Sequence, residues 1–392
     1  MKRKLVYLDN ASNTPLDKQV FKAMCPFLKE NFVGNANSIH DFGIKARNAV
    51  EKARDQIAEA TGFNREEIYF TSGATESNNW VLESLALHEL FEEKNPKKHL
   101  VVSAIEHASV LNTCKQLEKM GFSITYVKPE RNGHISVQKV AKALRYNTLL
   151  VCVMAANNET GALNGVNVIG ALAHQNKSLM MSDCTQFLSY GGKGTRLKNF
   201  LQNVDYCTFS GHKIYGPTGT GCLIASKSAP LYPLINGGAQ ENALRGGTSN
   251  TAGIVGLGKA MELWSKNNYE AHYKNLYCYL LLQLYKNNIP YRLNCQRSLY
   301  NIVNINFSQY IHDSELASLL AIYGIACSAG SACEASSSNA EETQSAPSHV
   351  LTAMGIPESE ISNSVRISFS KYTKKSDIDA FVKVMKHLKK EQ

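Results

Sequence analysis

The stretch HLVVSAIEHASVLNTCKQLEKMGFSITYVKP, residues 99–129, contains the unit that the fold repeats. Residues 99–107 form an apolar run typical of a buried strand, and residues 123–129 form a second such run. Between them, residues 108–121 have the apolar spacing of a helix. A strand, a helix and a strand in this order predict two parallel strands joined by a crossover helix.

The same alternation extends along the chain in both directions from this unit. Further strands are predicted at 67–73, 148–161 and 178–186, and further helices at 41–60, 74–93, 137–146 and 169–175. Gly62 is placed to end the first of these helices. Apolar strands that alternate with helices are typical of a mainly parallel sheet covered by helices on both faces, so the sequence predicts an α/β fold.

The pattern changes after the stretch GGAQENALRGGTSN, which ends at residue 250. One long helical region is predicted over 256–286, followed by strands at 301–307 and 364–370, a helix at 312–324 and a last helix near the end of the chain. We interpret this part as a smaller α+β domain. The predicted division is a large domain over 16–255 and a small domain made of 1–15 and 256–392.

Composition excludes several classes of function. Of the 392 residues 44% are hydrophobic, but no apolar run approaches the length of about 20 residues that a membrane span needs. The start of the chain lacks the apolar core of a secretory signal, so we expect a cytoplasmic location or a mature organelle form. The net charge is +9, but the basic residues are spread along the chain, so direct nucleic-acid binding is not expected.

The ten cysteines are scattered along the chain, with no Cys-x-x-Cys pair and no spacing typical of zinc ligands. We therefore expect no metal site. Cys152 and Cys207 lie in apolar runs and are expected to be buried, reduced thiols.

Polar residues follow several of the predicted strands. In such sheets a ligand tends to bind beyond the carboxyl ends of the strands. Each of these residues could instead be a turn or cap residue, but together they favour a binding site at that edge: His107, Asn158, Asp183, Gln186 and Lys213.

The stretch FSGHKIYGPTGTGCLIAS, residues 209–226, places Lys213 after a Ser-Gly-His tripeptide and before a glycine-rich run. A lysine there could form a Schiff base with an aldehyde cofactor, while Ser210 and His212 bind a phosphate. The turn at 73–75, between a strand and a helix, is of the kind that binds anions at a helix N-terminus. Taken alone, the motif fits an ordinary surface lysine beside a turn better than a cofactor lysine.

Residues 328–348 contain no Val, Leu, Ile, Met or aromatic residue. Such a segment cannot offset its ordering entropy by burial, so it predicts an exposed, mobile loop over about 327–348. Cys333 lies in its first third. A free cysteine without apolar neighbours is more typical of a reactive thiol than of a structural one.

Nine motifs in this order resemble those of the cysteine desulfurases, pyridoxal-phosphate enzymes of the class V aminotransferase group: YLDNAS, FTSGATESNN, EHASVLNTC, NNETGALN, SDCTQ, FSGHKIYGP, GGAQENALRGGT, CSAGSAC and VRISFS. The CSAGSAC motif resembles the active-site loop of the long-loop type. The resemblance implies the type I fold, with a seven-stranded-type sheet in the large domain. It also implies pyridoxal 5'-phosphate as the cofactor.

The resemblance gives the matching residues their roles. Lys213 would bind the cofactor aldehyde, and Asp183 would face the pyridine nitrogen and strengthen the ring as an electron sink. His107 would stack on the ring and transfer protons. Gln186 and Asn158 would contact the phenolic oxygen region of the ring.

Five residues would hold the cofactor phosphate: Ala74, Thr75, Ser210, His212 and Thr248. The family residue that matches Thr248 reaches the phosphate of the neighbouring subunit, which implies an obligate homodimer. Arg366 would bind the substrate carboxylate as a bidentate fork, with Asn158 as a second substrate-binding residue.

The implied reaction converts L-cysteine to L-alanine and leaves a persulfide on Cys333, with Lys213 and His107 as further catalytic residues. The persulfide would pass its sulfur to an acceptor protein, an iron–sulfur scaffold or a thiolation protein. Selenocysteine lyase and cysteine sulfinate desulfinase activities are alternatives on the same fold. A plain aminotransferase and a non-catalytic scaffold that binds a partner through the basic last helix also remain open.

Overall fold

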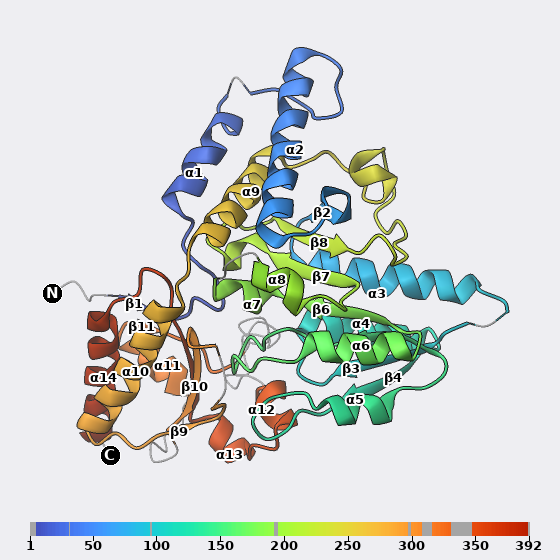
Figure 1. The fold of residues 1–392 in the computed structure, drawn as a ribbon. Coiled ribbons are helices and arrows are strands. Elements are labelled where there is room, and N and C mark those ends of the chain that lie inside the picture. Colours follow the sequence, from blue (N-terminus) through green and yellow to red (C-terminus); the bar gives the residue numbers. More distant parts are fainter. Residues whose placement is uncertain are drawn as a thin grey trace, which may run out of the picture.

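The computed structural model describes residues 5–30, 32–94, 96–191, 195–296, 299–307, 316–330 and 347–390. Its largest element is a seven-stranded sheet with helices on both faces (Figure 1). The strands lie in the order β2 (Ile68–Thr71), β8 (Gly221–Ala225), β7 (Tyr206–Ser210), β6 (Leu179–Asp183), β5 (Thr148–Cys152), β3 (His99–Ser103) and β4 (Ser123–Val127).

The sheet is mainly parallel, as predicted. Only β8 is reversed, pairing antiparallel with β2 and with β7. The strand, helix and strand predicted over residues 99–129 form β3, α4 (Ala108–Lys119) and β4. The two strands pair in parallel, from His99 with Ser123 to Ser103 with Val127. The predicted βαβ unit is therefore confirmed.

Successive side chains of the strands point to opposite faces and pack in two separate cores. On one face, Val101 and Val151 pack under helices α1 (Lys18–Met24), α2 (Asp41–Thr61), α5 (Val137–Ala143), α6 (Val166–Gln175), α7 (Thr185–Ser189), α8 (Thr195–Phe200) and α9 (Thr251–Lys266). On the other face, Leu100 and Leu150 pack under α3 (Ala74–Phe91) and α4. Gly62 ends α2 in the left-handed conformation, with φ 76°, as its position predicts.

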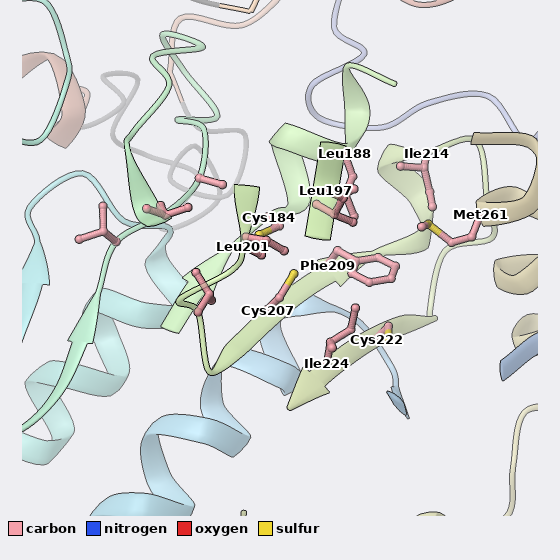
Figure 2. Close-up of a cluster of buried hydrophobic side chains, with 14 of the residues drawn as sticks. Cys184, Leu188, Leu197, Leu201, Cys207, Phe209, Ile214, Cys222, Ile224 and Met261 are labelled. Carbon is pink, nitrogen blue, oxygen red and sulfur yellow. The ribbon is translucent and has the colours of Figure 1, made fainter. Parts of the chain in front are cut away.

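Figure 2 shows part of the first core around β7 and β8. Cys207 and Phe209 of β7 lie beside Cys222 and Ile224 of β8 in this cluster. Cys152, predicted to be a buried thiol like Cys207, is also fully buried, and both are reduced.

A third core lies under a separate three-stranded antiparallel sheet (Figure 1). This sheet has the order β12 (Ser364–Ser368), β10 (Ile302–Asn306) and β9 (Arg292–Leu293). The core also contains residues from α10 (Glu270–Lys286), α11 (Leu316–Ile322), α14 (Lys375–Lys390) and the short pair β1 (Val6–Tyr7) and β11 (Ile325–Ala326). Two short helices, α12 (His349–Ala353) and α13 (Glu358–Ile361), bring their apolar residues back to the first core.

The prediction of one helix over 256–286 is wrong. Two helices, α9 and α10, occupy this region, because Asn267 is extended, with φ −117° and ψ 143°, and ends α9. Asn268 then accepts a hydrogen bond from the backbone N–H of Glu270, at 2.9 Å, at the start of α10.

The division into two domains stays a prediction. The predicted boundary at 255/256 falls inside α9, whose residues on both sides of it, Ile254 and Leu257, pack in the first core. We therefore propose that the large domain extends to the end of α9 at Lys266.

None of the helices within the described ranges is long and apolar enough to cross a membrane.

The contact between α6 and the segment after α8 makes a first prediction. A Cβ atom at Gly170 would lie 2.0 Å from the carbonyl oxygen of Asn203, so Gly170→Ala must push these segments apart. We expect a loss of about 1–3 kcal/mol in the free energy of unfolding, seen as a lower thermal midpoint. Gly165→Ala, at the start of the same helix, is the control because nothing lies within 4 Å of its Cβ position. Equal midpoints for the two variants would contradict the prediction.

Candidate active site

A cavity of about 270 Å³ opens beyond the carboxyl ends of the parallel strands. Every predicted site residue that the structure describes lines it, except Thr248: Ala74, Thr75, His107, Asn158, Asp183, Gln186, Ser210, His212, Lys213 and Arg366. They come from five segments that follow strands of the large sheet, and from β12 in the case of Arg366.

Lys213 lies on the turn η3 (Gly211–Lys213), directly after β7. The turn is tight, since the carbonyl oxygen of Gly211 accepts hydrogen bonds from the backbone N–H groups of Ile214 and Gly216. The amine Nζ of Lys213 donates to the carbonyl oxygen of Ala11 at 2.6 Å and to that of Ser12 at 2.5 Å. The lysine is thus aimed into the cavity and held there by the N-terminal segment.

Asp183 ends β6 and is 6% exposed. Its Oδ2 accepts a hydrogen bond from the side-chain amide of Asn78 at 2.9 Å, and its Oδ1 accepts one from the backbone N–H of Thr185, also at 2.9 Å. Asn78 is fixed in turn, because its Oδ1 accepts from the hydroxyl of Thr208 at 2.6 Å. The carboxylate is therefore held in one orientation at the cavity wall.

The N-terminus of α3 forms another part of the wall. The backbone N–H of Ala74 donates to the hydroxyl oxygen of Ser210 at 2.8 Å, which links this helix to the end of β7. Helix N-termini attract anions through their unsatisfied N–H groups and their dipole. Ala74, Thr75 and Ser210 together offer an anion site at one end of the cavity.

Two histidines lie at the cavity in different settings. His107 caps α4, and its Nδ1 accepts the backbone N–H of Ser109 at 3.1 Å, so the proton of the neutral ring lies on Nε2. Burial and the positive charge of Lys213 lower the pKa of His212 to about 4. His212 is therefore neutral at pH 7, and its one N–H, at Nδ1, donates to Asn13 Oδ1 at 3.1 Å.

Arg366 reaches the cavity from β12 of the three-stranded sheet and is 1% exposed. Its Nη2 donates to Asp9 Oδ1 at 2.7 Å and to Ser12 Oγ at 2.6 Å, and its Nη1 donates to the carbonyl oxygen of Asn158 at 3.0 Å. These bonds attach the second sheet to the strand ends of the first. The guanidinium is the group at the cavity best suited to bind a carboxylate.

Gln186 and Asn158 complete the predicted set. The amide of Gln186 donates to the carbonyl oxygen of Ala11 at 2.9 Å. Asn158 does not lie on a strand, because β5 ends at Cys152 and not at the predicted residue 161. Asn157 turns the chain by accepting the backbone N–H groups of Glu159 and Thr160 on its Oδ1.

Comparison with known proteins identifies the group. The family model described as Aminotransferase class-V matches residues 6–381. A protein of Dictyoglomus turgidum named cysteine desulfurase IscS is 39% identical over 391 residues, which is 99% of this chain and 95% of that protein. This chain belongs to the cysteine desulfurase family. It is a pyridoxal-phosphate-dependent enzyme that acts on L-cysteine.

Solved structures agree with this assignment. A NifS-like protein, 35% identical, has a TM-score of 0.87, and the match covers 99% of this chain and all of that one. A structure described as SspA in complex with cysteine, 36% identical, has a TM-score of 0.79 over 94% of this chain and all of that one. The predicted type I fold is confirmed. The selenocysteine lyase and cysteine sulfinate desulfinase alternatives are not favoured by these relatives.

The cavity of this desulfurase fits pyridoxal phosphate. Asn158 Oδ1 and Thr185 Oγ1 are buried at its wall and have no hydrogen-bond partner among the described residues, so the wall offers polar groups to a ligand. An amine, a buried carboxylate and a helix N-terminus match the aldehyde, the ring nitrogen and the phosphate of the cofactor. Within the described ranges, no cluster of three or more His, Cys, Asp or Glu side chains could hold a metal ion.

Two further site residues are predicted, Cys333 and Thr248. Cys333 lies outside the described residues, as does most of the predicted loop over 327–348. Thr248 is exposed and does not line the cavity of its own chain. Their roles stay predictions.

Sequence reasoning missed five residues that line the cavity: Ala11, Ser12, Met154, Ala156 and Thr185. Ala11 and Ser12 belong to the YLDNAS motif, which is one of the motifs shared with the family. No role was assigned to its residues, because nothing in the local sequence shows that the segment near residue 11 contacts Lys213. Met154 and Ala156 were included in a predicted strand. Asn78, behind Asp183, looked like an ordinary helix residue.

Glu106, next to His107, is fully buried. Its Oε1 accepts the hydroxyl of Ser103 at 2.5 Å and the backbone N–H of Met154 at 2.7 Å, and its Oε2 has no partner among the described residues. Burial, strengthened by the negative charge of Asp183, raises the pKa of Glu106 from its ordinary value of 4.5 to about 8. At pH 7 this side chain is a neutral acid.

This shift predicts a pH dependence of stability. Between pH 4.5 and pH 8 the folded chain keeps the Glu106 proton and the unfolded chain loses it, so the contribution of Glu106 falls as pH rises, by roughly 1.4 kcal/mol per pH unit. Glu106→Gln removes this dependence. Urea unfolding at pH 5, 6, 7 and 8 should show the variant gaining stability relative to the wild type toward higher pH. Parallel curves would show that Glu106 titrates alike in both states.

Proposed function

We propose that this desulfurase moves the sulfur of L-cysteine onto Cys333 and releases L-alanine, with the site residues in the roles given below. The observation that carries the proposal is the meeting of Lys213, Asp183 and Arg366 at one cavity, although they come from three segments and two sheets. A lysine, a buried carboxylate and a buried guanidinium suit an aldehyde cofactor, its ring nitrogen and an amino-acid carboxylate.

The cofactor is held at both of its ends in this proposal. Lys213 binds the aldehyde, and the phosphate lies at the N-terminus of α3 with the hydroxyl of Ser210. His212 is neutral, and in this proposal its N–H leaves Asn13 Oδ1 and donates to the phosphate. Asp183, fixed by Asn78, keeps the ring nitrogen protonated.

The remaining residues handle the substrate. Arg366 and Asn158 bind and orient L-cysteine, and Gln186 contacts the phenolic oxygen of the cofactor. Bound pyridoxal phosphate supplies an electron sink for negative charge at the substrate Cα. The amine of Lys213 would take the Cα proton and return a proton to Cα after the sulfur has left, and the Nε2–H of His107 would transfer protons near the reacting sulfur.

The sulfur transfer step balances without an added oxidant. The thiolate of Cys333 attacks the substrate sulfur, a sulfur–sulfur bond forms and the Cβ–S bond breaks. Its electron pair stays on Cβ, which takes a proton and becomes the methyl group of L-alanine. Cys333 ends as a persulfide, which a sulfur-acceptor protein then takes up. An iron–sulfur scaffold and a thiolation protein are the two acceptor classes that we propose.

We further propose that the enzyme works as a homodimer in the cytoplasm. Large apolar side chains are exposed on and around α1 and α2, where a second copy could cover them: Phe21, Leu28, Val33, Ile39 and Phe42. Thr248, exposed on its own chain, would then complete the phosphate site of the neighbouring subunit.

The role of Cys333 is tested by Cys333→Ala with radiolabelled L-cysteine. We expect alanine formation to fall at least about a hundredfold, because no thiolate takes the sulfur, and the protein to carry no label after the reaction. Cys278→Ala is the matched control, since Cys278 is the exposed cysteine of α10. Lys213→Ala should lose the visible absorbance of the bound cofactor. Alanine formation at the wild-type rate by Cys333→Ala would sink the persulfide route.

Mixed dimers test the role of Thr248. Sedimentation should give twice the chain mass of 43.2 kDa. Thr248→Ala should bind pyridoxal phosphate more weakly by about tenfold, since one hydrogen bond to a charged group is lost. In a mixed dimer with Lys213→Ala, the Lys213→Ala subunit has a disabled pocket but an intact Thr248. That threonine should restore cofactor affinity in the pocket of the Thr248→Ala subunit. No recovery in verified mixed dimers would mean that Thr248 does not act across subunits.

A further inference from the structure

Ser12 lies between the two groups that the proposed function places on either side of the substrate. Its carbonyl oxygen accepts a hydrogen bond from Lys213 Nζ at 2.5 Å, and its hydroxyl oxygen accepts one from Arg366 Nη2 at 2.6 Å. The residue is only partly buried and lines the cavity. Its backbone carbonyl therefore positions Lys213, while its hydroxyl oxygen accepts a hydrogen bond from the guanidinium of Arg366.

The guanidinium of Arg366 has no spare position at Nη2. The two hydrogens of Nη2 bind Asp9 Oδ1 at 2.7 Å and Ser12 Oγ. A carboxylate that binds this arm of the fork must therefore replace one of the two acceptors.

Ser12 is the acceptor that the carboxylate replaces. Asp9 and Arg366 form an ion pair at 2.7 Å with side chains 16% and 2% exposed, and separating a largely buried pair leaves uncompensated charge. Asp9 Oδ1 also accepts the hydroxyl of Ser328 at 3.1 Å, which fixes it further. The hydroxyl of Ser12 is a neutral acceptor, and a neutral acceptor binds a guanidinium less strongly than a carboxylate does.

We propose that Ser12 is a substrate-binding residue, whose hydroxyl leaves Arg366 when L-cysteine enters and donates a hydrogen bond to the substrate carboxylate. The proposal rests on the role proposed above for Arg366. A serine hydroxyl can do this because it accepts or donates after a simple rotation. In the free enzyme it occupies the place of the carboxylate at Nη2 of Arg366. In the complex Ser12 and Arg366 hold the same carboxylate.

Steady-state kinetics of Ser12→Ala give the first test. The variant keeps the carbonyl that holds Lys213 and loses only the hydroxyl. We expect KM for L-cysteine to rise about tenfold and kcat to stay within about twofold, because the contact is the same in the ground state and the transition state. A KM equal to that of the wild type overturns the proposal, as does a loss confined to kcat.

Binding of two non-reacting probes to the holoenzyme gives a second, independent test. S-methyl-L-cysteine has the carboxylate, and its methyl ester lacks the charge. Calorimetry should show that Ser12→Ala weakens the acid about tenfold and leaves the ester within about twofold. Ser12→Thr keeps a hydroxyl and should retain most of the preference for the acid. An equal loss for both probes would mean that Ser12 acts only on the shape of the cavity.

Matched controls separate this proposal from the proposed function. Ser328→Ala removes the other hydroxyl of the Asp9–Arg366 network, but Ser328 does not line the cavity, so the preference for the acid should be unchanged. Arg366→Lys should abolish most of that preference. If it does and Ser12→Ala does not, only the role of Ser12 is wrong. If Arg366→Lys leaves the preference intact, the carboxylate site itself is misplaced.

Discussion

The active site depends on the contact of the N-terminal segment with two basic side chains. Ala11 and Ser12 accept Lys213 on their carbonyl oxygens, while Ser12 and Asp9 accept Arg366 on their side chains. Lys213 follows β7 of the seven-stranded sheet and Arg366 lies on β12 of the three-stranded sheet, so these few residues set the position of one sheet's functional group relative to the other's. Their hydrogen bonds to charged groups are among the stronger ones available to a protein.

The parallel sheet determines where the remaining groups gather. Because parallel strands end at the same edge, the residues after β2, β3, β6 and β7 meet there without any specific contact between distant segments. Orientation needs more than this. Asp183 is aimed by Asn78 on α3, and Asn78 by Thr208 on β7, so three neighbouring elements hold one carboxylate. Such a buried chain of hydrogen bonds is rigid because each member satisfies the next.

Charge at the site is controlled by burial. Lys213 and the surrounding protein keep His212 neutral, with a pKa of about 4, while the dry surroundings of Glu106 keep that acid protonated. Among the described residues that line the cavity, Lys213 and Arg366 are the lysine and the arginine, and we propose that both bind ligand groups. A site with few competing charges gives each of them more influence on a bound anion.

The sequence by itself determined the α/β alternation, the strand-end residues and, through its motifs, the family, because periodicity and turn chemistry are local properties. It misjudged the end of β5, which lies at Cys152, and the break between α9 and α10, which lies at Asn267. Only the tertiary structure decided that Ser12 meets both Lys213 and Arg366, and that Glu106 is a neutral acid. The contacts of Ser12 with Lys213 and Arg366 join residues about 200 and 354 positions apart, and the pKa of Glu106 depends on the loss of water around its side chain. Neither leaves a signal in the local sequence, because both arise only when the chain has folded.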